Sequence, residues 1–286
     1  MTTDLVLSWY RKWDSNPHRR YAQGILSPSC LPFHHFGSLG DNVMFHICVC
    51  KGSKLIMKTK TKQQNVCEVI IDIGDDASAI DIGNNQAILI AADGIWGQIM
   101  NVNPYWAGYC AVLVNVNDIA AMGAKPLAMV NIMSIYHEDI YEDLLRGIKD
   151  GCLKFNVPMV GGHLHPDADV DSVGVAIVGI AKKDKLITSF DAKVGEKVIV
   201  AIDLDGKPHE MFALNWDTTY DKDAKLVQDQ IKAVQYLAEN DLVKAGKDIS
   251  NPGILGTLEI NSKGIKRIFE ESMSSRNRNE CRVCRV

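Results

Sequence analysis

The sequence predicts an α+β fold in which strands form one sheet and helices cover one of its faces. Runs that are almost wholly apolar and rich in β-branched residues, such as residues 69–73 and 173–181, are typical of buried strands. Between these runs, apolar residues recur at helical spacing in two longer segments, residues 104–123 and 138–155. The resulting order β-β-α-β-α-β-β indicates a sheet that is backed by helices on one face.

Turn signals define the first part of the predicted sheet. The strand at residues 69–73 breaks at Gly74. Two strands flank the turn sequence at residues 83–85, which predicts a hairpin. The second strand of this hairpin, residues 87–92, is nearly all apolar, and Asp93 follows at its end.

The two helices alternate with the remaining strands. Pro104 stands where the first turn of a helix tolerates proline, and Gly123 is a natural helix stop. A strand is predicted at residues 127–135, before the second helix. After that helix, a short apolar run at residues 157–160 leads into a Gly-Gly-His sequence, and the strand at 173–181 follows.

A second region of α/β character is predicted in the last third of the chain. Residues 198–202 have the apolar character of a strand, and residues 222–240 have the pattern of a helix. Ser250 or Asn251 is a suitable N-cap for a last helix at residues 254–260.

The predicted division has four parts, which are a poorly structured extension at 1–62, a first domain at 63–185, a second domain at 186–262 and a disordered tail at 263–286. Apolar patterning fades near the end of the second domain. We therefore expect a truncated second domain that exposes apolar side chains and supports nucleotide binding with little turnover.

Composition limits the classes of function that we expect for this protein. The chain has 286 residues and a net charge of -4, which gives no general case for nucleic-acid or membrane binding. No run is long and apolar enough for a transmembrane helix, and the start lacks the apolar core of a signal peptide, so we expect a cytoplasmic protein. The eight Cys are scattered, which favours reduced thiols over a disulfide framework or a zinc site.

Acidic side chains follow the buried elements of the first domain. Asp75 and Asp76 come directly after the first strand, Asp93 ends the second, and Asp118 lies near the end of the first helix. Residues 66–117 contain no Lys or Arg. Clustered carboxylates without local cations repel one another, and all-oxygen ligands favour Mg²⁺. The alternative is that these acids shape turns, caps or structural pairs.

Asp248 is a further candidate ligand in the second domain. It lies in a loop that feeds the N-terminus of the last predicted helix. Helix N-termini favour phosphate groups because of their free N–H groups and the helix dipole. The alternative is that this loop only caps the helix.

Five ordered motifs carry a resemblance to a known superfamily. They are residues 74–77 (GDDA), Asp93, residues 117–126 (NDIAAMGAKP), residues 161–163 (GGH) and residues 248–250 (DIS). The chain resembles the superfamily of aminoimidazole ribonucleotide synthetase, selenophosphate synthetase, thiamine-monophosphate kinase and the hydrogenase maturation protein that dehydrates a carbamoyl group. The resemblance covers roughly residues 64–260.

Four longer motifs resemble the archaeal branch of this superfamily called methanogenesis marker protein 2. They are residues 92–97 (ADGIWG), 106–110 (WAGYC), 160–166 (VGGHLHP) and 215–219 (NWDTT).

The superfamily resemblance implies a fold, two cofactors and a dimer. The implied fold is a ferredoxin-like N-terminal ATP-binding domain, whose sheet forms a homodimer, followed by an α/β C-terminal domain that is truncated in this chain. Members bind ATP and Mg²⁺ and phosphorylate or activate a small-molecule substrate. We therefore expect ATP, Mg²⁺, a small metabolite and a second copy of the chain as partners.

The resemblance also assigns roles to residues. The implied metal ligands are Asp75, Asp76, Asp93, Asp118 and Asp248. The implied nucleotide contacts are Asn117, Gly161, Gly162, Ser250 and Asn251, and the implied catalytic residues are Asp93, Asp118 and His163.

Some positions depart from the superfamily pattern. Ala91 and Ala92 stand where thiamine-monophosphate kinases carry hydroxyl residues, and His163 and Asn251 stand where those kinases carry acids. These departures keep a second function class open, a nucleotide-binding regulatory or assembly protein without turnover. No motif identifies the metabolite.

His163 and His165 form a separate motif. One face of an extended segment would hold both side chains, a pattern that could bind a transition metal or relay protons. The alternative is one hydrogen-bonded His and one surface His.

Overall fold

The computed structural model describes residues 68–166, 168–193, 195–212, 215–249 and 253–260, together with the backbone of two earlier strands. The chain divides into two compact units, Met1–Gln64 and Asn65–Val286. The predicted tail at 263–286 lies outside the described residues. The predicted boundary between residues 185 and 186 stays a prediction.

The described part of the first unit is an antiparallel hairpin. Strands β1 (Val43–Cys50) and β2 (Lys54–Thr61) pair so that Val43 lies opposite Thr61. This hairpin occupies part of the range for which the sequence predicts a poorly structured extension. The rest of that range, apart from these two strands, lies outside the described residues.

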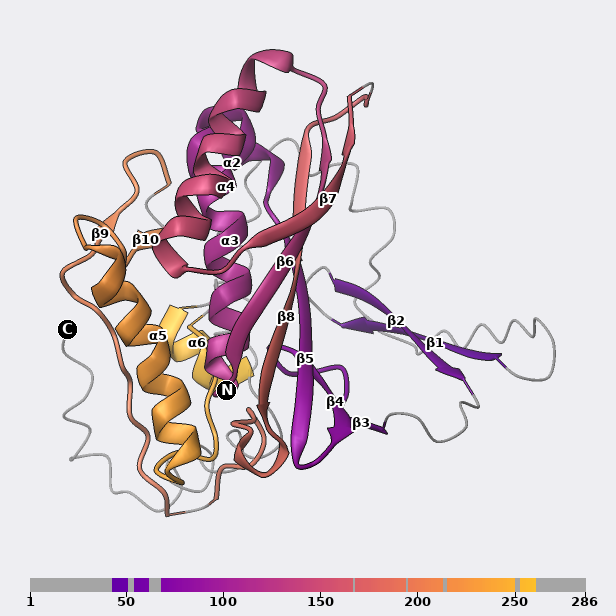
Figure 1. The fold of residues 1–286 in the computed structure, drawn as a ribbon, viewed down its shortest axis with the longest axis vertical. Coiled ribbons are helices and arrows are strands. Elements are labelled where there is room, and N and C mark those ends of the chain that lie inside the picture. The colour runs from indigo at the N-terminus through magenta and orange to yellow at the C-terminus, as the bar shows by residue number, and fades with distance from the viewer. Residues whose placement is uncertain are drawn as a thin grey trace, which may run out of the picture. The chain divides into compact units, whose positions relative to one another are not determined.

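The second unit is built on a six-stranded mixed sheet with the order β3-β4-β5-β8-β6-β7 (Figure 1). Only β6 and β7 run parallel, and the other neighbouring strands of this sheet are antiparallel. The strands are β3 (Glu68–Ile71), β4 (Ser78–Gly83), β5 (Gln86–Gly94), β6 (Lys125–Ser134), β7 (Met159–His165) and β8 (Ser172–Lys182).

Helices cover one face of this sheet. In Figure 1, α2 (Gly97–Val102), α3 (Pro104–Ala121) and α4 (Tyr141–Phe155) lie on one side of the strands. A short 3₁₀ turn, η2 (Glu138–Ile140), leads into α4. Inward side chains of the sheet, such as Leu89 and Ile177, are fully buried with the residues of α3. The predicted sheet with helices on one face is confirmed.

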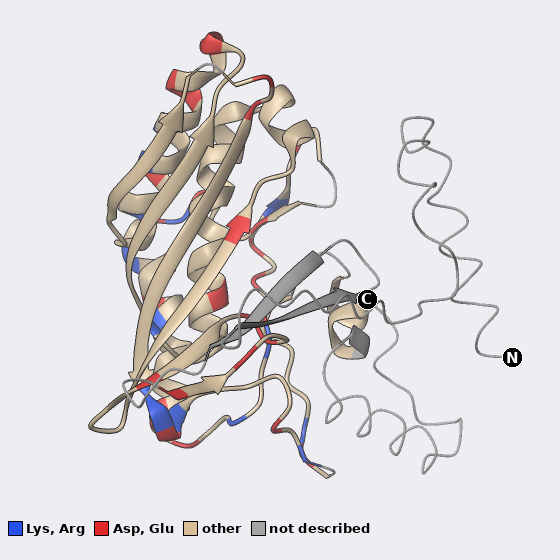
Figure 2. Ribbon diagram, turned by 90° about the vertical axis from the view of Figure 1, so that its right-hand side faces the viewer, with Lys and Arg blue, Asp and Glu red and all other residues tan. Residues whose placement is uncertain are grey.

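The other face of the sheet is open and largely uncharged in the described unit. Figure 2 shows the strands from this side, with few charged residues along their length. Ile90, Val130 and Ile132 expose 43%, 42% and 61% of their surface. Such a contiguous apolar face is typical of a surface that contacts another protein.

Two glycines allow α3 and α4 to pack backbone against backbone. A Cβ added to Gly108 would lie 2.1 Å from the Leu144 carbonyl oxygen, and one added to Gly147 would lie 1.9 Å from the Tyr105 carbonyl oxygen. Since neither distance is possible for real atoms, any larger residue would force the helices apart. Asn103 caps α3 because its side chain accepts a hydrogen bond from the Trp106 N–H at 3.0 Å.

The last third of the described chain consists mainly of two helices and long loops. A 3₁₀ turn, η3 (Lys183–Lys185), follows β8. Two short strands, β9 (Lys207–Pro208) and β10 (Trp216–Asp217), pair antiparallel. Helices α5 (Ala224–Glu239) and α6 (Gly253–Ile260) match the predicted helices.

Two predictions about the fold are wrong. Residues 198–202 form no strand, because no neighbouring strand in the described chain offers them hydrogen-bond partners. Their side chains are exposed, as expected, with Ile199 at 81%. The ferredoxin-like topology is also wrong, because that fold has the order β-α-β-β-α-β. Here α4 joins β6 to β7 as parallel neighbours, which gives the order β-α-β-α-β-β from β5 onward.

Among the described residues, no helix has both the length and the apolar character needed to cross a bilayer.

Candidate metal centre

Three carboxylates that are distant in sequence meet at one point of the second unit. Asp76, Asp118 and Asp248 each offer one oxygen, and these three oxygens lie within 4.8 Å of one another. All three residues are half-buried. Since they come from three separate segments, only the tertiary fold brings them together.

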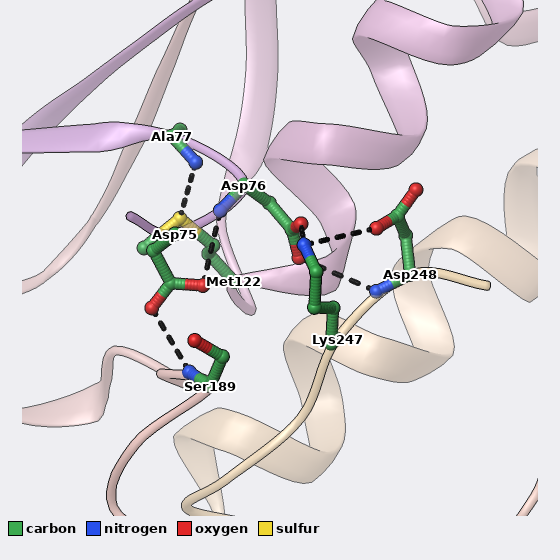
Figure 3. Close-up of polar contacts among 7 residues, drawn as sticks. All are labelled: Asp75, Asp76, Ala77, Met122, Ser189, Lys247 and Asp248. Carbon is green, nitrogen blue, oxygen red and sulfur yellow. Dashed lines mark hydrogen bonds and ion pairs between the residues drawn. The ribbon is translucent and has the colours of Figure 1, made fainter. Parts of the chain in front are cut away.

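Asp76 is positioned by its neighbour Asp75. The Asp75 carboxylate accepts a hydrogen bond from the Asp76 N–H at 3.0 Å and another from the Ser189 N–H at 2.9 Å (Figure 3). The next N–H, of Ala77, points at the sulfur of Met122, 3.0 Å away. Asp75 therefore fastens the loop after β3 to the segment that follows η3, and it leaves Asp76 to face the cluster.

Asp118 is positioned by the core. It lies in the last turn of α3, between Val116 and Ile119, which are both 0% exposed. Because these neighbours anchor the helix against the sheet, the backbone of Asp118 has little freedom to move.

Asp248 is brought to the cluster by a chain of backbone contacts. The Gly246 N–H donates to the Thr188 carbonyl at 3.0 Å, and the Ile187 N–H donates to the Met122 carbonyl at 3.1 Å. The Asp248 N–H itself points at the second carboxylate oxygen of Asp76 at 3.3 Å. The loop before α6 is thus held against the end of α3 through residues 187–188.

A lysine lies among the acids. The Lys247 ammonium forms an ion pair with Asp76 and lies 3.3 Å from an oxygen of Asp248 (Figure 3). The Asp76 side chain is only 2% exposed and that of Lys247 18%. The sequence argument that these acids lack a cationic partner is therefore wrong for Asp76, because its partner comes from the other end of the described chain.

The contact with Lys247 does not offset the burial of Asp76. Burial raises the pKa of Asp76 to about 7, with a further contribution from the charge of Asp248, and the contact with Lys247 opposes this shift. Burial alone would lower the pKa of Lys247, but Asp76 and Asp248 outweigh burial and raise it. Burial and the Asp248 charge therefore favour a proton or a cation at Asp76.

The donor set fits a hard divalent cation. The three side chains supply only carboxylate oxygens, which Mg²⁺ and Ca²⁺ prefer over softer metals. The Lys247 ammonium lies against two of these carboxylates. A cation that binds all three acids would have to displace this ammonium from Asp76.

The other predicted site residues lie elsewhere or next to this cluster. Asp93, at the end of β5, accepts a hydrogen bond from the Gly94 N–H at 2.8 Å and is not one of the three clustered acids. Asn117 precedes Asp118 on α3. The other predicted residues fall into two groups, namely Gly161, Gly162 and His163 within β7 and Ser250 and Asn251 outside the described residues.

Gly162 has a steric reason to be glycine. A Cβ at this position would lie 1.8 Å from the side-chain oxygen of Asn131 on the neighbouring strand β6. Its predicted role as a nucleotide contact stays a prediction.

Sequence reasoning missed Lys247 and the two residues that hold the loop, Met122 and Ser189. A signal for Lys247 was present, since it is adjacent to the predicted ligand Asp248. No signal pointed to Ser189, because its contribution is a backbone N–H that any residue could supply.

A family model matches this chain, and its curated relatives include the following two proteins. Residues 74–181 match the family model described as AIR synthase related protein, N-terminal domain. An uncharacterized protein of Methanocaldococcus jannaschii is 54% identical over 201 residues, which cover 69% of this chain and 62% of the relative. A selenide, water dikinase of Carboxydothermus hydrogenoformans is 27% identical over 192 residues, which cover 65% of this chain and 55% of the relative. The chain spans about three fifths of these relatives.

A solved structure supports the fold. The T. maritima PurL complexed with ADP has a TM-score of 0.56 and 20% identity, and the match covers 68% of this chain and 32% of that chain. The family match confirms the predicted resemblance to this superfamily for residues 74–181. The finer resemblance to the archaeal marker protein stays a prediction.

Proposed function

We propose that the protein binds ATP with Mg²⁺ and phosphorylates or activates a small metabolite, because residues 74–181 match the AIR synthase related N-terminal domain. The observation that carries this proposal is the meeting of Asp76, Asp118 and Asp248 within 4.8 Å. Two of these acids lie inside the family match and the third lies outside it. The names of the compared proteins, a dikinase and a PurL complexed with ADP, agree with nucleotide chemistry.

Phosphoryl transfer needs charge neutralisation and positioning more than a covalent protein group. Asp76, Asp118 and Asp248 would hold Mg²⁺, and the bound ion would supply charge stabilisation at the phosphate oxygens. The protein contributes rigid placement, because Asp75 fixes the Asp76 loop and the core fixes α3.

Lys247 has two roles in this proposal. Without metal, its ammonium neutralises part of the charge of Asp76 and Asp248. If a cation bound the cluster, the Lys247 ammonium would be available to stabilise nearby phosphate oxygens as a point charge. Lys247 is thus both a competitor for the metal and a candidate phosphate contact.

The remaining predicted roles are part of the same proposal. Asn117, Gly161, Gly162, Ser250 and Asn251 are the proposed nucleotide contacts. Asp75 and Asp93 are kept as proposed ligands, for a second cation or a rearranged loop. Asp93, Asp118 and His163 are kept as proposed catalytic residues.

A second candidate function is nucleotide binding without turnover, in a regulatory or assembly protein. The placement of Lys247 favours it, because an ammonium against Asp76 and Asp248 leaves fewer carboxylate oxygens for a multi-metal cluster. The alanines at positions 91 and 92, where related kinases carry hydroxyl groups, also favour nucleotide binding without turnover.

We also propose that the protein is a homodimer that uses the open face of the sheet. This face carries the exposed apolar side chains of β5 and β6, and helices cover only the opposite face. A second copy would bury these side chains by symmetric contact, which is the commonest arrangement in soluble oligomers. At roughly 25 cal/mol per Å² of apolar surface, such burial is a substantial driving force.

Calorimetry with ATP, in the presence and absence of Mg²⁺, tests the proposed function. We expect Asp118→Asn and Asp248→Asn to weaken Mg-ATP binding at least about tenfold, the smallest effect typical of disturbed metal ligation. Asp229→Asn is the matched control, because Asp229 is an exposed acid on α5. Equal affinity in all four proteins would contradict the metal assignment, and a metabolite screen for ATP turnover separates the two candidate functions.

A further inference from the structure

A pair of histidines stands on the edge strand of the sheet. His163 and His165 are two positions apart on β7 (Met159–His165), so their side chains leave the strand on the same face. Their ring centroids are 4.5 Å apart, with an angle of 70° between the ring planes. The two imidazoles are therefore direct neighbours.

Both rings are exposed and have ring nitrogens available. Neither imidazole makes a hydrogen bond or an ion pair with any residue that the structure describes, although each contacts the other ring. By contrast, the Nδ1 atom of His137, on the loop after β6, lies 2.5 Å from the Oδ2 atom of Asp171. The His163–His165 pair is thus not explained by a structural hydrogen bond.

The pair lies on the open face of the sheet, away from the helices. In the parallel register, His163 pairs with Ile132 on β6, and Ile132 is 61% exposed. The next residue of β6, Met133, points to the helix side and is only 5% exposed. On the same face of β7, Gly161 contributes no side chain next to His163.

The spacing of the rings suits metal chelation. Two imidazoles that bind one tetrahedral zinc ion at about 2.0–2.1 Å have ring centres roughly 5 Å apart. The observed 4.5 Å is close to this value, so a small side-chain rotation is sufficient. Imidazole nitrogens favour Zn²⁺, Cu²⁺ and Ni²⁺, whereas Mg²⁺ prefers oxygen ligands.

We infer that His163 and His165 form a transition-metal site on β7 that is chemically distinct from the carboxylate cluster. The neutral imidazoles supply two ligands, and the remaining coordination positions are open to water or to an incoming ligand. The site is selective against Mg²⁺, so Mg-ATP and a transition metal can bind the same chain. The proposal does not depend on the proposed ATP-dependent activity.

Metal titration of the full chain tests this inference. Zn²⁺ binding is measured by competition with a chromogenic chelator, and Cu²⁺ binding is measured by electron paramagnetic resonance, which detects nitrogen ligands. We expect His163→Gln and His165→Gln each to weaken the Zn²⁺ site at least about tenfold. Both variants should also lose the spectrum of two coordinated nitrogens.

The controls separate this site from other metal-binding groups of the chain. The sequence contains eight His and eight Cys, which can also bind metal. The test therefore compares the Zn²⁺ affinities of the variants and does not use the total metal bound. His137→Gln should leave the Zn²⁺ titration unchanged, and circular dichroism should show that all three variants are folded. Equal Zn²⁺ affinity in wild type, His163→Gln and His165→Gln would overturn the inference, as would a Cu²⁺ spectrum that does not change.

Discussion

Lys247 and Asp76, which are 171 positions apart in the sequence, form an ion pair at the centre of the carboxylate cluster. This pair joins the loop after β3 to the loop before α6, so it closes the candidate site. Breaking a largely buried pair leaves an uncompensated charge, which is more costly than the pair itself is stabilising. We therefore expect Lys247 to affect both the stability of the site and its affinity for cations.

Lys247→Met should raise the affinity of the nucleotide-free protein for Mg²⁺. The variant removes a cation that competes for Asp76 and Asp248, while its side chain keeps a similar length. Calorimetry with Mg²⁺ alone measures the change, and Lys244→Met, which alters an exposed lysine, is the control. If Mg²⁺ binds Lys247→Met no better than wild type, Lys247 does not compete with the metal.

The stability of the metal-free protein should fall as pH rises between about 4 and about 7, through Asp76. Its pKa rises from 3.8 to about 7 on folding, so the native state holds more protons than the unfolded state in this range. Above the native pKa, the buried charge is fully present and the penalty is complete. Urea unfolding at about pH 5 and about pH 8 measures the effect.

Asp76→Asn should reduce this pH dependence, because the amide does not titrate. It should also make Mg²⁺ binding weaker and less dependent on pH, since Mg²⁺ binds the deprotonated carboxylate. An unchanged slope of stability against pH in Asp76→Asn would show that another group titrates in this range.

The contact between His137 and Asp171 should stabilise the protein at neutral pH, and this stabilisation should be lost at acidic pH. Burial alone would raise the pKa of Asp171, but hydrogen bonds from His137 and from the Tyr136 N–H lower it. A depressed carboxyl pKa contributes stability that is present above the unfolded pKa and lost as pH falls through the folded pKa.

Asp171→Asn should therefore be less stable at neutral pH and lose less stability on acidification than wild type. Unfolding by urea across the acid range measures both effects. Asp169→Asn, two residues earlier and exposed, is the control and should behave like wild type. Parallel pH profiles for Asp171→Asn and wild type would contradict the prediction.

Gly147→Ala should destabilise the second unit, although alanine favours helices. The added Cβ would meet the Tyr105 carbonyl oxygen at 1.9 Å, so α3 and α4 must separate. Overpacking of this kind costs roughly 1–3 kcal/mol, which is at or above the ~1 kcal/mol that Ala gains over Gly in a helix.

Gly97→Ala is the matched control for this substitution. Gly97 begins α2, and a Cβ there would meet nothing within 4 Å. Thermal unfolding should show a clear loss of stability in Gly147→Ala and none in Gly97→Ala. Equal melting temperatures would mean that the two helices can move apart without cost.

Ile132→Asp should convert the proposed dimer into a monomer. Ile132 is 61% exposed on the open face of β6, where a second copy would bury it. An unpaired carboxylate in that interface would lose its hydration without a partner. Light scattering measures the mass, and Ile199→Asp, at a residue that is 81% exposed outside the sheet, is the control. A wild-type monomer would rule out the dimer.

The sequence by itself determined most of the secondary structure of the second unit. Apolar runs and helical spacing predicted the strands from β3 to β8 and the helices α3 and α4, because burial on one face imposes a period of two or 3.6 residues. The short helix α2 was not predicted. The conformations of Gly83 and Gly123, both at positive φ, also follow from the sequence, since glycine adopts them without strain. Residues 198–202 were predicted wrongly, because an apolar run forms a strand only where a neighbouring strand can pair with it.

The candidate site depended on the tertiary structure. Asp76, Asp118 and Asp248 could be singled out as acids at the ends of buried elements, but their meeting within 4.8 Å depends on how residues 187–188 tie the loop before α6 to α3. Asp75 and Asp76 are adjacent and chemically identical, and only hydrogen-bond geometry separates the residue that fastens the loop from the residue that faces the cluster. The sequence did not reveal the contact of Lys247 with Asp76, because electrostatic interactions depend on distance in space and not on separation along the chain.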